Sequence, residues 1–105
     1  MKPATIPEPT RAEIDARPGG LLLEFGASWC GYCRAAQHII ESALSQYPNL
    51  PHIRIEDGQG KRLGRSFAVK LWPTLIVLHD GVELARLVRP QTVGDILAAL
   101  QTLDN

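Results

Sequence analysis

Hydrophobic positions recur along the chain with two different spacings: every second residue, which is typical of strands, and every third or fourth residue, which is typical of helices. Short apolar or alternating runs predict four strands, at residues 21–25, 52–57, 74–79 and 82–88. Apolar positions spaced by three and four predict three main helices, at residues 33–47, 61–70 and 93–103. The predicted order is therefore strand, helix, strand, helix, strand, strand, helix.

The connections between these elements predict how the strands pair. Asp80 and Gly81 separate the last two strands, and an Asp-Gly pair is a strong signal for a two-residue hairpin turn. We therefore expect the last two strands to be antiparallel and the first two, joined through a helix, to be parallel. The elements as a whole predict an α/β fold with a central mixed four-stranded sheet flanked by helices.

The N-terminal segment differs from the rest of the chain in composition. It contains four prolines and ends in a glycine pair, which are Pro3, Pro7, Pro9, Pro18, Gly19 and Gly20. This predicts an arm over residues 1–19, with one short helix at residues 10–16 capped by Thr10, followed by a single domain over residues 20–105. The prolines fall where a secretory signal needs an apolar stretch, so we expect no signal peptide here.

Composition and charge exclude several classes of partner. The chain has 105 residues, 45% of them hydrophobic and 21% charged, as in ordinary globular domains. The 11 basic and 11 acidic residues balance, which argues against a nucleic-acid-binding protein or a polybasic membrane-binding protein. Apolar runs such as Leu75 to Leu78 are far shorter than the ~18 residues of a membrane span.

The only two cysteines are Cys30 and Cys33, which form a Cys-x-x-Cys motif. A disulfide across two intervening residues closes so short a loop that it adds little stability. Disulfide-stapled secreted domains usually carry four or more cysteines. We therefore expect the cysteine pair to have a chemical role rather than a stabilising one. We also expect the protein to be cytoplasmic; the alternative is an exported protein whose signal peptide has been removed.

The motif lies where a predicted strand ends and a predicted helix begins. At a helix N-terminus, free backbone N–H groups and the helix dipole stabilise a negatively charged sulfur at Cys30, and the thiolate is the attacking form. Cys33, about one turn along, is placed to attack a mixed disulfide on Cys30. Zinc is the alternative ligand, but structural zinc sites need four ligands and the chain has no second cysteine pair, so we expect no metal.

Three stretches resemble the thioredoxin-like family. In chain order they are Leu22-Leu23-Glu24-Phe25, Ala27-Ser28-Trp29-Cys30-Gly31-Tyr32-Cys33 and Trp72-Pro73-Thr74. The resemblance covers about residues 20 to 103. It implies a thioredoxin fold and a monomeric thiol–disulfide oxidoreductase that uses no cofactor beyond its own redox-active cysteine pair. Its implied partners are protein disulfide or dithiol substrates and an upstream reductase or thiol donor.

The resemblance also implies roles for individual residues. Cys30 matches the family's nucleophile and Cys33 its resolving cysteine. Pro73 matches a cis-proline that faces the disulfide and lets the backbone of Trp72 pair with substrate. Glu24 matches a position usually held by a buried Asp that exchanges protons with the resolving cysteine, so we expect burial to raise its pKa. The alternative for Glu24 is a solvent-facing charge on a strand.

The sequence departs from the family pattern around the cysteine pair. Gly31-Tyr32 stands where Gly-Pro is commonest and resembles the centres of bacterial disulfide isomerases, so the direction of electron transfer is open. Gly26 replaces a common Trp, and Trp72 stands where Ile or Val is usual. Arg89 falls where a small Gly normally lines the substrate groove. That cation would favour an anionic partner or stabilise the thiolate; the alternative is a solvated strand end.

We expect the substrate-contacting residues to be Trp29, Gly31, Tyr32, Trp72, Pro73 and Arg89. Trp29 and Trp72 would form an apolar rim, whereas as core residues each would need a partner for its indole N–H. Of the histidines, His38 is expected on the polar face of its helix and His52 near the site end of its strand. Three other functions stay open: a glutathione-dependent, glutaredoxin-like reductase, a disulfide isomerase or oxidase, and a non-enzymatic partner-binding module.

Overall fold

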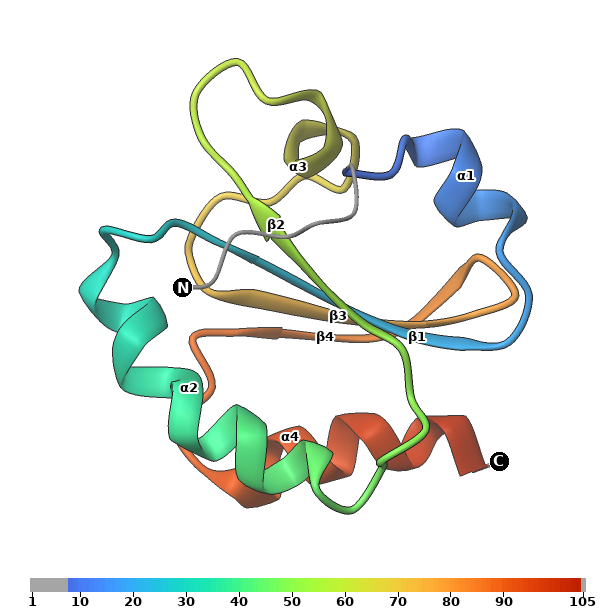
Figure 1. Ribbon diagram of the computed structural model, residues 1–105, viewed down its shortest axis with the longest axis vertical. Helices are drawn as coiled ribbons and strands as arrows, with labels where there is room; N and C mark the ends of the chain where they lie inside the picture. Colours follow the sequence, from blue (N-terminus) through green and yellow to red (C-terminus); the bar gives the residue numbers. More distant parts are fainter. Residues whose placement is uncertain (1–7, 105) are drawn as a thin grey trace.

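The computed structural model describes residues 8–104, in which one mixed sheet carries helices on both faces (Figure 1). The strands are β1 (Gly20–Gly26), β2 (His52–Glu56), β3 (Thr74–His79) and β4 (Val82–Val88). The helices are α1 (Arg11–Ala16), α2 (Gly31–Leu44), α3 (Arg62–Ser66) and α4 (Val93–Leu100), and a 3-10 helix η1 (Gln101–Asp104) ends the described chain.

The strands lie in the order β2-β1-β3-β4. β1 and β2 are parallel and β3 and β4 antiparallel, as predicted, and the hairpin turn has positive φ at Asp80 and Gly81. β1 also pairs antiparallel with β3, which places β1 and β3 in the middle of the sheet. Because both faces of these strands are covered, both are buried and mainly apolar, although Glu24 interrupts the apolar run of β1.

Alternate residues of the central strands supply two separate cores. Leu21, Leu23 and Phe25 face the layer of α1 and α3, whereas Leu22 faces α2 and α4. Figure 1 shows these two helix layers on opposite sides of the sheet. The parity of a residue in β1 therefore decides which helices it contacts, and Glu24 shares the parity of Leu22.

Three helices differ in length from their predictions. α2 begins at Gly31, because Cys30 is already its N-cap. It ends at Leu44, and beyond its C-cap the backbone N–H groups as far as Tyr47 bond the carbonyl three residues earlier, which gives a tighter turn than an α-helix. α3 covers only Arg62–Ser66, and the positive φ of Ala68 just beyond it is incompatible with a continuing helix. The last predicted helix is α-helical only to Leu100.

The N-terminal helix packs on the sheet. Thr10 caps α1 in a capping box with Glu13, and Ile14 is 1% exposed within the core of the α1 and α3 layer. Arg11 donates a hydrogen bond to the Ser66 carbonyl and lies 3.8 Å over the Phe67 ring. Residues 1–7 of the predicted arm lie outside the described residues. Between residues 8 and 104, no helix is long and apolar enough to cross a membrane.

Candidate active site

The two cysteines meet at the start of α2. Cys30 is the N-cap residue, and its Sγ accepts a hydrogen bond of 3.2 Å from the backbone N–H of Cys33. Both are free thiols, 6% and 7% exposed. The strand-to-helix junction therefore holds the Cys30 sulfur against the N-terminus of α2, as the motif's position predicts.

Gly26, the last residue of β1, makes room for the second sulfur. A Cβ at this position would lie 2.8 Å from Cys33 Sγ, closer than side-chain atoms can approach. Burial raises the pKa of the Cys33 thiol to about 12, with further contributions from the hydrogen bond to Cys30 and the negative charge of Glu24. Cys33 is therefore a neutral thiol at neutral pH.

Glu24 lies between the sheet and α2, and it is 4% exposed, so the solvent-facing alternative is wrong. Its Oε1 lies 2.7 Å from His52 Nε2, and its Oε2 accepts a 2.8 Å hydrogen bond from Gln37 Nε2. Arg54, its neighbour across the β1–β2 pair, approaches Oε1 to 3.5 Å. Gln37 Nε2 also donates to the Cys33 carbonyl at 3.1 Å, which connects the carboxylate to the cysteine loop.

The expectation that burial raises the pKa of Glu24 is wrong. Burial does act upward on this pKa, but hydrogen bonds from His52 and Gln37 and the positive charge of Arg54 together hold it below its usual value of 4.5. A buried carboxylate with two donors and a cation is more stable charged than neutral. Glu24 is therefore ionised at neutral pH.

The environment of Glu24 was only partly foreseen from the sequence. His52 begins β2, at the end of the strand away from the cysteines, so its expected place at the site end is wrong, although its ring still reaches Glu24. Gln37 and Arg54 were not foreseen. The alternation of β2 puts Arg54 on the same face as His52, and this is the one signal that was present in the sequence.

Trp72 and Pro73 lie across from the cysteines. The Trp72–Pro73 peptide bond is cis, as the resemblance implied. The Trp72 indole N–H donates a 2.9 Å hydrogen bond to Asp57 Oδ2, and its ring meets Trp29 edge-on with centroids 5.4 Å apart. Trp72 also packs against the buried cluster of Ala27, Cys30 and Cys33. Trp29 is thus an exposed rim residue, whereas Trp72 is half-buried with a partner, Asp57, that sequence analysis did not find.

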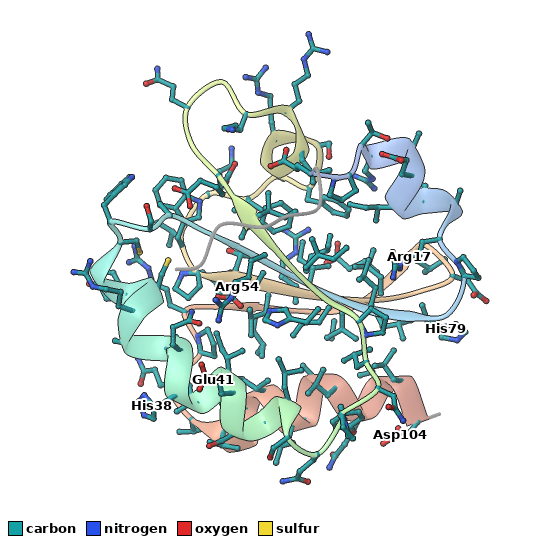
Figure 2. The ribbon with its side chains drawn as sticks, viewed as in Figure 1. Arg17, His38, Glu41, Arg54, His79 and Asp104 are labelled. Atoms are coloured by element: carbon teal, nitrogen blue, oxygen red, sulfur yellow. The ribbon has the colours of Figure 1, made fainter. Side chains whose placement is uncertain are left out.

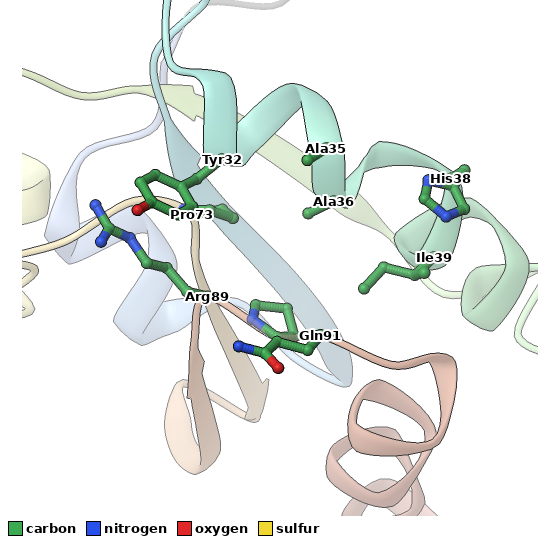
Figure 3. A pocket seen from close by; sticks show the side chains of 9 residues that line it. Tyr32, Ala35, Ala36, His38, Ile39, Pro73, Arg89 and Gln91 are labelled. Carbon is green, nitrogen blue, oxygen red and sulfur yellow. The ribbon is translucent and has the colours of Figure 1, made fainter.

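Arg89 joins the site rather than forming a solvated strand end. Its backbone has φ 52 and donates a 2.9 Å hydrogen bond to the Pro73 carbonyl. Its side-chain Nε donates to the Trp72 carbonyl at 2.8 Å, and its guanidinium carbon lies 3.8 Å from the centroid of the Tyr32 ring. Figure 3 shows Arg89 and Tyr32 beside Pro73. The side chain therefore spans from the loop before β3 to the start of α2.

A groove of about 470 Å³ opens beside these residues. Its lining comprises Tyr32, Ala35, Ala36, His38, Ile39, Pro73, Arg89, Pro90 and Gln91. The lining contains a cation but no carboxylate. His38 lies on the exposed side of α2, as expected. Within residues 8–104, no three His, Cys, Asp or Glu side chains are grouped as metal ligands.

Comparison with known proteins identifies the family. The sequence model of the Thioredoxin family matches residues 8–102. The chain belongs to the thioredoxin family. Thioredoxin from Chlamydia pneumoniae is 34% identical over 70 residues, which cover 67% of this chain and 69% of that protein. Thioredoxin-1 from Saccharomyces cerevisiae is 27% identical over 95 residues, which cover 86% and 92%.

A solved structure of a thioredoxin supports the same assignment. Thioredoxin 2 from Pseudomonas aeruginosa PAO1, in its reduced form, is 49% identical and superposes with a TM-score of 0.82, covering 91% of this chain and 89% of that chain. The predicted thioredoxin fold and thiol–disulfide oxidoreductase activity are thereby confirmed. Membership of the thioredoxin family implies protein disulfide substrates and a reductase partner.

Proposed function

We propose that this thioredoxin-family enzyme reduces protein disulfides, with Cys30 as nucleophile and Cys33 as resolving cysteine. The Cys30 thiolate attacks one substrate sulfur, forming a mixed disulfide and releasing the other substrate sulfur as a thiolate. Cys33 then loses its proton and attacks Cys30 Sγ, which releases the substrate as a dithiol. Two electrons pass to the substrate, and an upstream reductase or thiol donor restores the Cys30–Cys33 pair.

The observation that carries this proposal is the unequal setting of the two sulfurs. Cys30 Sγ accepts the Cys33 N–H at the N-terminus of α2, whereas burial raises the pKa of the Cys33 thiol to about 12. One sulfur is thus set to attack first, and the other stays protonated until the mixed disulfide has formed. No cofactor is needed for this exchange, because the cysteines themselves carry the electrons.

Glu24 takes the proton that Cys33 loses, as the family resemblance implies for this position. The negative charge of Glu24 acts on Cys33, and Gln37 bonds both the carboxylate and the Cys33 carbonyl. Because its pKa is lowered, Glu24 holds the proton only briefly.

Substrate approaches over an apolar rim. Trp29 and Tyr32 are exposed beside the buried Cys30, Gly31 leaves the start of α2 open, and the Trp72 backbone next to Pro73 offers pairing for an extended chain. A protein substrate suits such a surface because aromatic residues are enriched at interface centres. The monomeric state and the cytoplasmic location stay predictions from the sequence.

Cysteine substitutions test the mechanism directly. Cys30→Ser should abolish the reduction of insulin disulfides, because no nucleophile remains. Cys33→Ser should accumulate mixed disulfides with substrate, visible by mass spectrometry as adducts that a reductant removes. Normal turnover by Cys30→Ser would contradict the mechanism. Circular dichroism of both variants checks that they are folded.

The reduction potential of the pair tests the direction of electron flow. We expect a value near the thioredoxin end of the scale, about −270 mV, in thiol-buffer titrations with mass-spectrometric readout. A value near about −120 mV would instead make the enzyme a disulfide oxidase or isomerase.

A glutaredoxin-like use of glutathione is the second candidate, because Tyr32 and Arg89 lie together at the groove. Recycling by glutathione and glutathione reductase would support it, and failure of that recycling would exclude it. Family membership favours an enzyme over the partner-binding module. Persistent binding of a partner after both cysteines are replaced would favour the module instead.

A further inference from the structure

Arg89 occupies the backbone acceptor that the proposed substrate contact needs. An extended peptide lying beside Pro73 would pair with the Trp72 backbone, but the Trp72 carbonyl already accepts the Arg89 Nε–H at 2.8 Å. The neighbouring Pro73 carbonyl accepts the Arg89 backbone N–H at 2.9 Å. A carbonyl oxygen has two lone pairs, and Arg89 takes one of them, so a peptide N–H must share this oxygen with Arg89 unless the side chain turns away.

Backbone geometry gives no reason for an arginine at this position. The φ of 52 at Arg89 lies in the left-handed region, where glycine is at ease and other residues are strained. The contacts of the side chain must offset that strain. These contacts are the hydrogen bond to the Trp72 carbonyl and the contact with the Tyr32 ring. Because Tyr32 is itself 60% exposed, the Arg89 side chain packs at the surface of the groove rather than in the core.

The guanidinium has donors to spare. Arginine carries five N–H donors, and only Nε–H is engaged by a partner among residues 8–104. Stacking on Tyr32 holds the guanidinium at the rim of the groove, whose lining contains no carboxylate (Figure 3). Two parallel N–H donors on one guanidinium match the two oxygens of a carboxylate.

We propose that Arg89 selects disulfide substrates whose peptide chain carries an Asp or Glu beside the reactive cysteine. The substrate carboxylate binds the terminal nitrogens of Arg89 and draws the side chain off the Trp72 carbonyl, which then pairs with the substrate backbone. A neutral or basic segment lacks this compensation and competes with Arg89 for the same acceptor. The inference rests on the proposed function, since it concerns the same groove and the same exchange reaction.

Three disulfide peptides that differ only in the residue next to the reactive cysteine test the inference. With Glu, Gln or Lys at that place, wild type should show a kcat/KM about fivefold higher for Glu than for Gln, the size of a partly screened ion pair, and lowest for Lys. The difference should lie in KM, because the carboxylate is bound before and during reaction. It should shrink as salt rises from 0.05 to 0.5 M, by charge screening.

Variants at position 89 separate the charge from the blocked carbonyl. Arg89→Gly should lose the preference for Glu and reduce the Gln peptide at least as well as wild type, because the Trp72 carbonyl is free. Arg89→Lys should keep only part of the preference, since it retains the charge without the paired donors. Arg34→Gln is the control for loss of a positive charge, because Arg34 is an exposed arginine on the first turn of α2, and this variant should keep the wild-type preference.

The outcomes distinguish this inference from the proposed function. Equal kcat/KM for the three peptides in wild type, or an unchanged preference in Arg89→Gly, would overturn the role of Arg89 and leave the exchange mechanism intact. Failure of wild type to reduce insulin and all three peptides would overturn both. Glutathione disulfide as a fourth substrate provides a further arm. If it alone depended on Arg89, the ligand would be a small anionic thiol and the peptide assignment would be wrong.

Discussion

Glu24 illustrates at the level of one residue how neighbours can reverse the effect of burial. Burial alone favours a neutral carboxyl group, and this was the expectation from its place on a buried strand. The structure surrounds it with Gln37 from α2 and with His52 and Arg54 from β2. Each of these groups favours the charged form, so the site contains a carboxylate rather than a carboxylic acid.

We expect Glu24 to make the stability of the enzyme acid-sensitive. Its pKa in the folded chain lies below the unfolded value of 4.5, so its contribution is present above about pH 4.5 and is lost as pH falls through the folded value. Glu24→Gln should flatten this part of the pH dependence and lower stability at pH 7. Denaturant unfolding at pH 3 to 7 measures both effects.

A matched control for this experiment lies on the surface of α2. Glu41 is exposed, and Glu41→Gln should leave the pH dependence as in wild type (Figure 2). A Glu24→Gln variant with the wild-type slope below pH 5 would show that Glu24 is not the group responsible.

At the level of elements, the site depends on how β1 ends and α2 begins. The strand ends in Gly26 under Cys33 Sγ, and the helix begins with Cys30 as its cap. Gly26 provides no aromatic side chain here, where the family commonly has a Trp. Trp72, whose indole N–H is bonded to Asp57, instead packs against the cysteine cluster from the loop before β3. The aromatic side chain beside the cysteines thus comes from the loop before β3 rather than from the end of β1, where the family pattern suggests it.

Gly26→Ala should disturb the resolving sulfur. The added Cβ would lie 2.8 Å from Cys33 Sγ, and such overpacking typically costs about 1–3 kcal/mol of stability. Insulin reduction should fall as well, because Cys33 must move toward Cys30 to resolve the mixed disulfide. Denaturant unfolding and an insulin turnover assay measure the two effects.

Gly31→Ala is the control for that substitution. No atom lies within 4 Å of a Cβ built at Gly31, so alanine fits there, and its higher helix propensity should keep or slightly raise stability. Equal stability of the two variants would refute the close-packing argument at Gly26.

On the scale of the whole molecule, the N-terminal helix completes one face of the sheet. Ile14 of α1 is buried with Leu21 and Leu78, and the backbone of Asp15 lies so close to the hairpin that a Cβ on Gly81 would come within 2.0 Å of its carbonyl oxygen. α1 and the β3–β4 hairpin, far apart in sequence, therefore pack directly against each other. Whether the predicted boundary at residue 19 separates α1 from the domain therefore depends on whether α1 unfolds together with the rest of the chain.

Ile14→Ala measures how far α1 belongs to the cooperative unit. If α1 unfolds with the domain, the variant should lose about 2–4 kcal/mol, as for other buried Ile-to-Ala changes. Val82→Ala, at an exposed position of β4, should change stability by less than about 0.5 kcal/mol. Equal stability of the two variants in denaturant unfolding would place α1 outside the cooperative domain, as the predicted boundary implies.

The sequence by itself determined the local architecture and the centre of the chemistry. Periods of two and of three to four located the strands and helices, and Asp80-Gly81 determined the hairpin. Cys30 and Cys33 at a strand-to-helix junction indicated thiol chemistry, and the family resemblance around Pro73 implied its cis bond. These features depend on residues close in sequence, so a pattern within one segment suffices to predict them.

Only the tertiary structure decided what surrounds that centre. The charge state of Glu24, the anchoring of Trp72 by Asp57 and the hold of Arg89 on the Trp72 carbonyl each depend on which elements become neighbours. Neighbouring elements and their register follow from packing of the whole sheet and its helices, and no local pattern encodes the resulting distances. Because ion pairs and hydrogen bonds act over a few ångströms, their effects exist only once those distances are set.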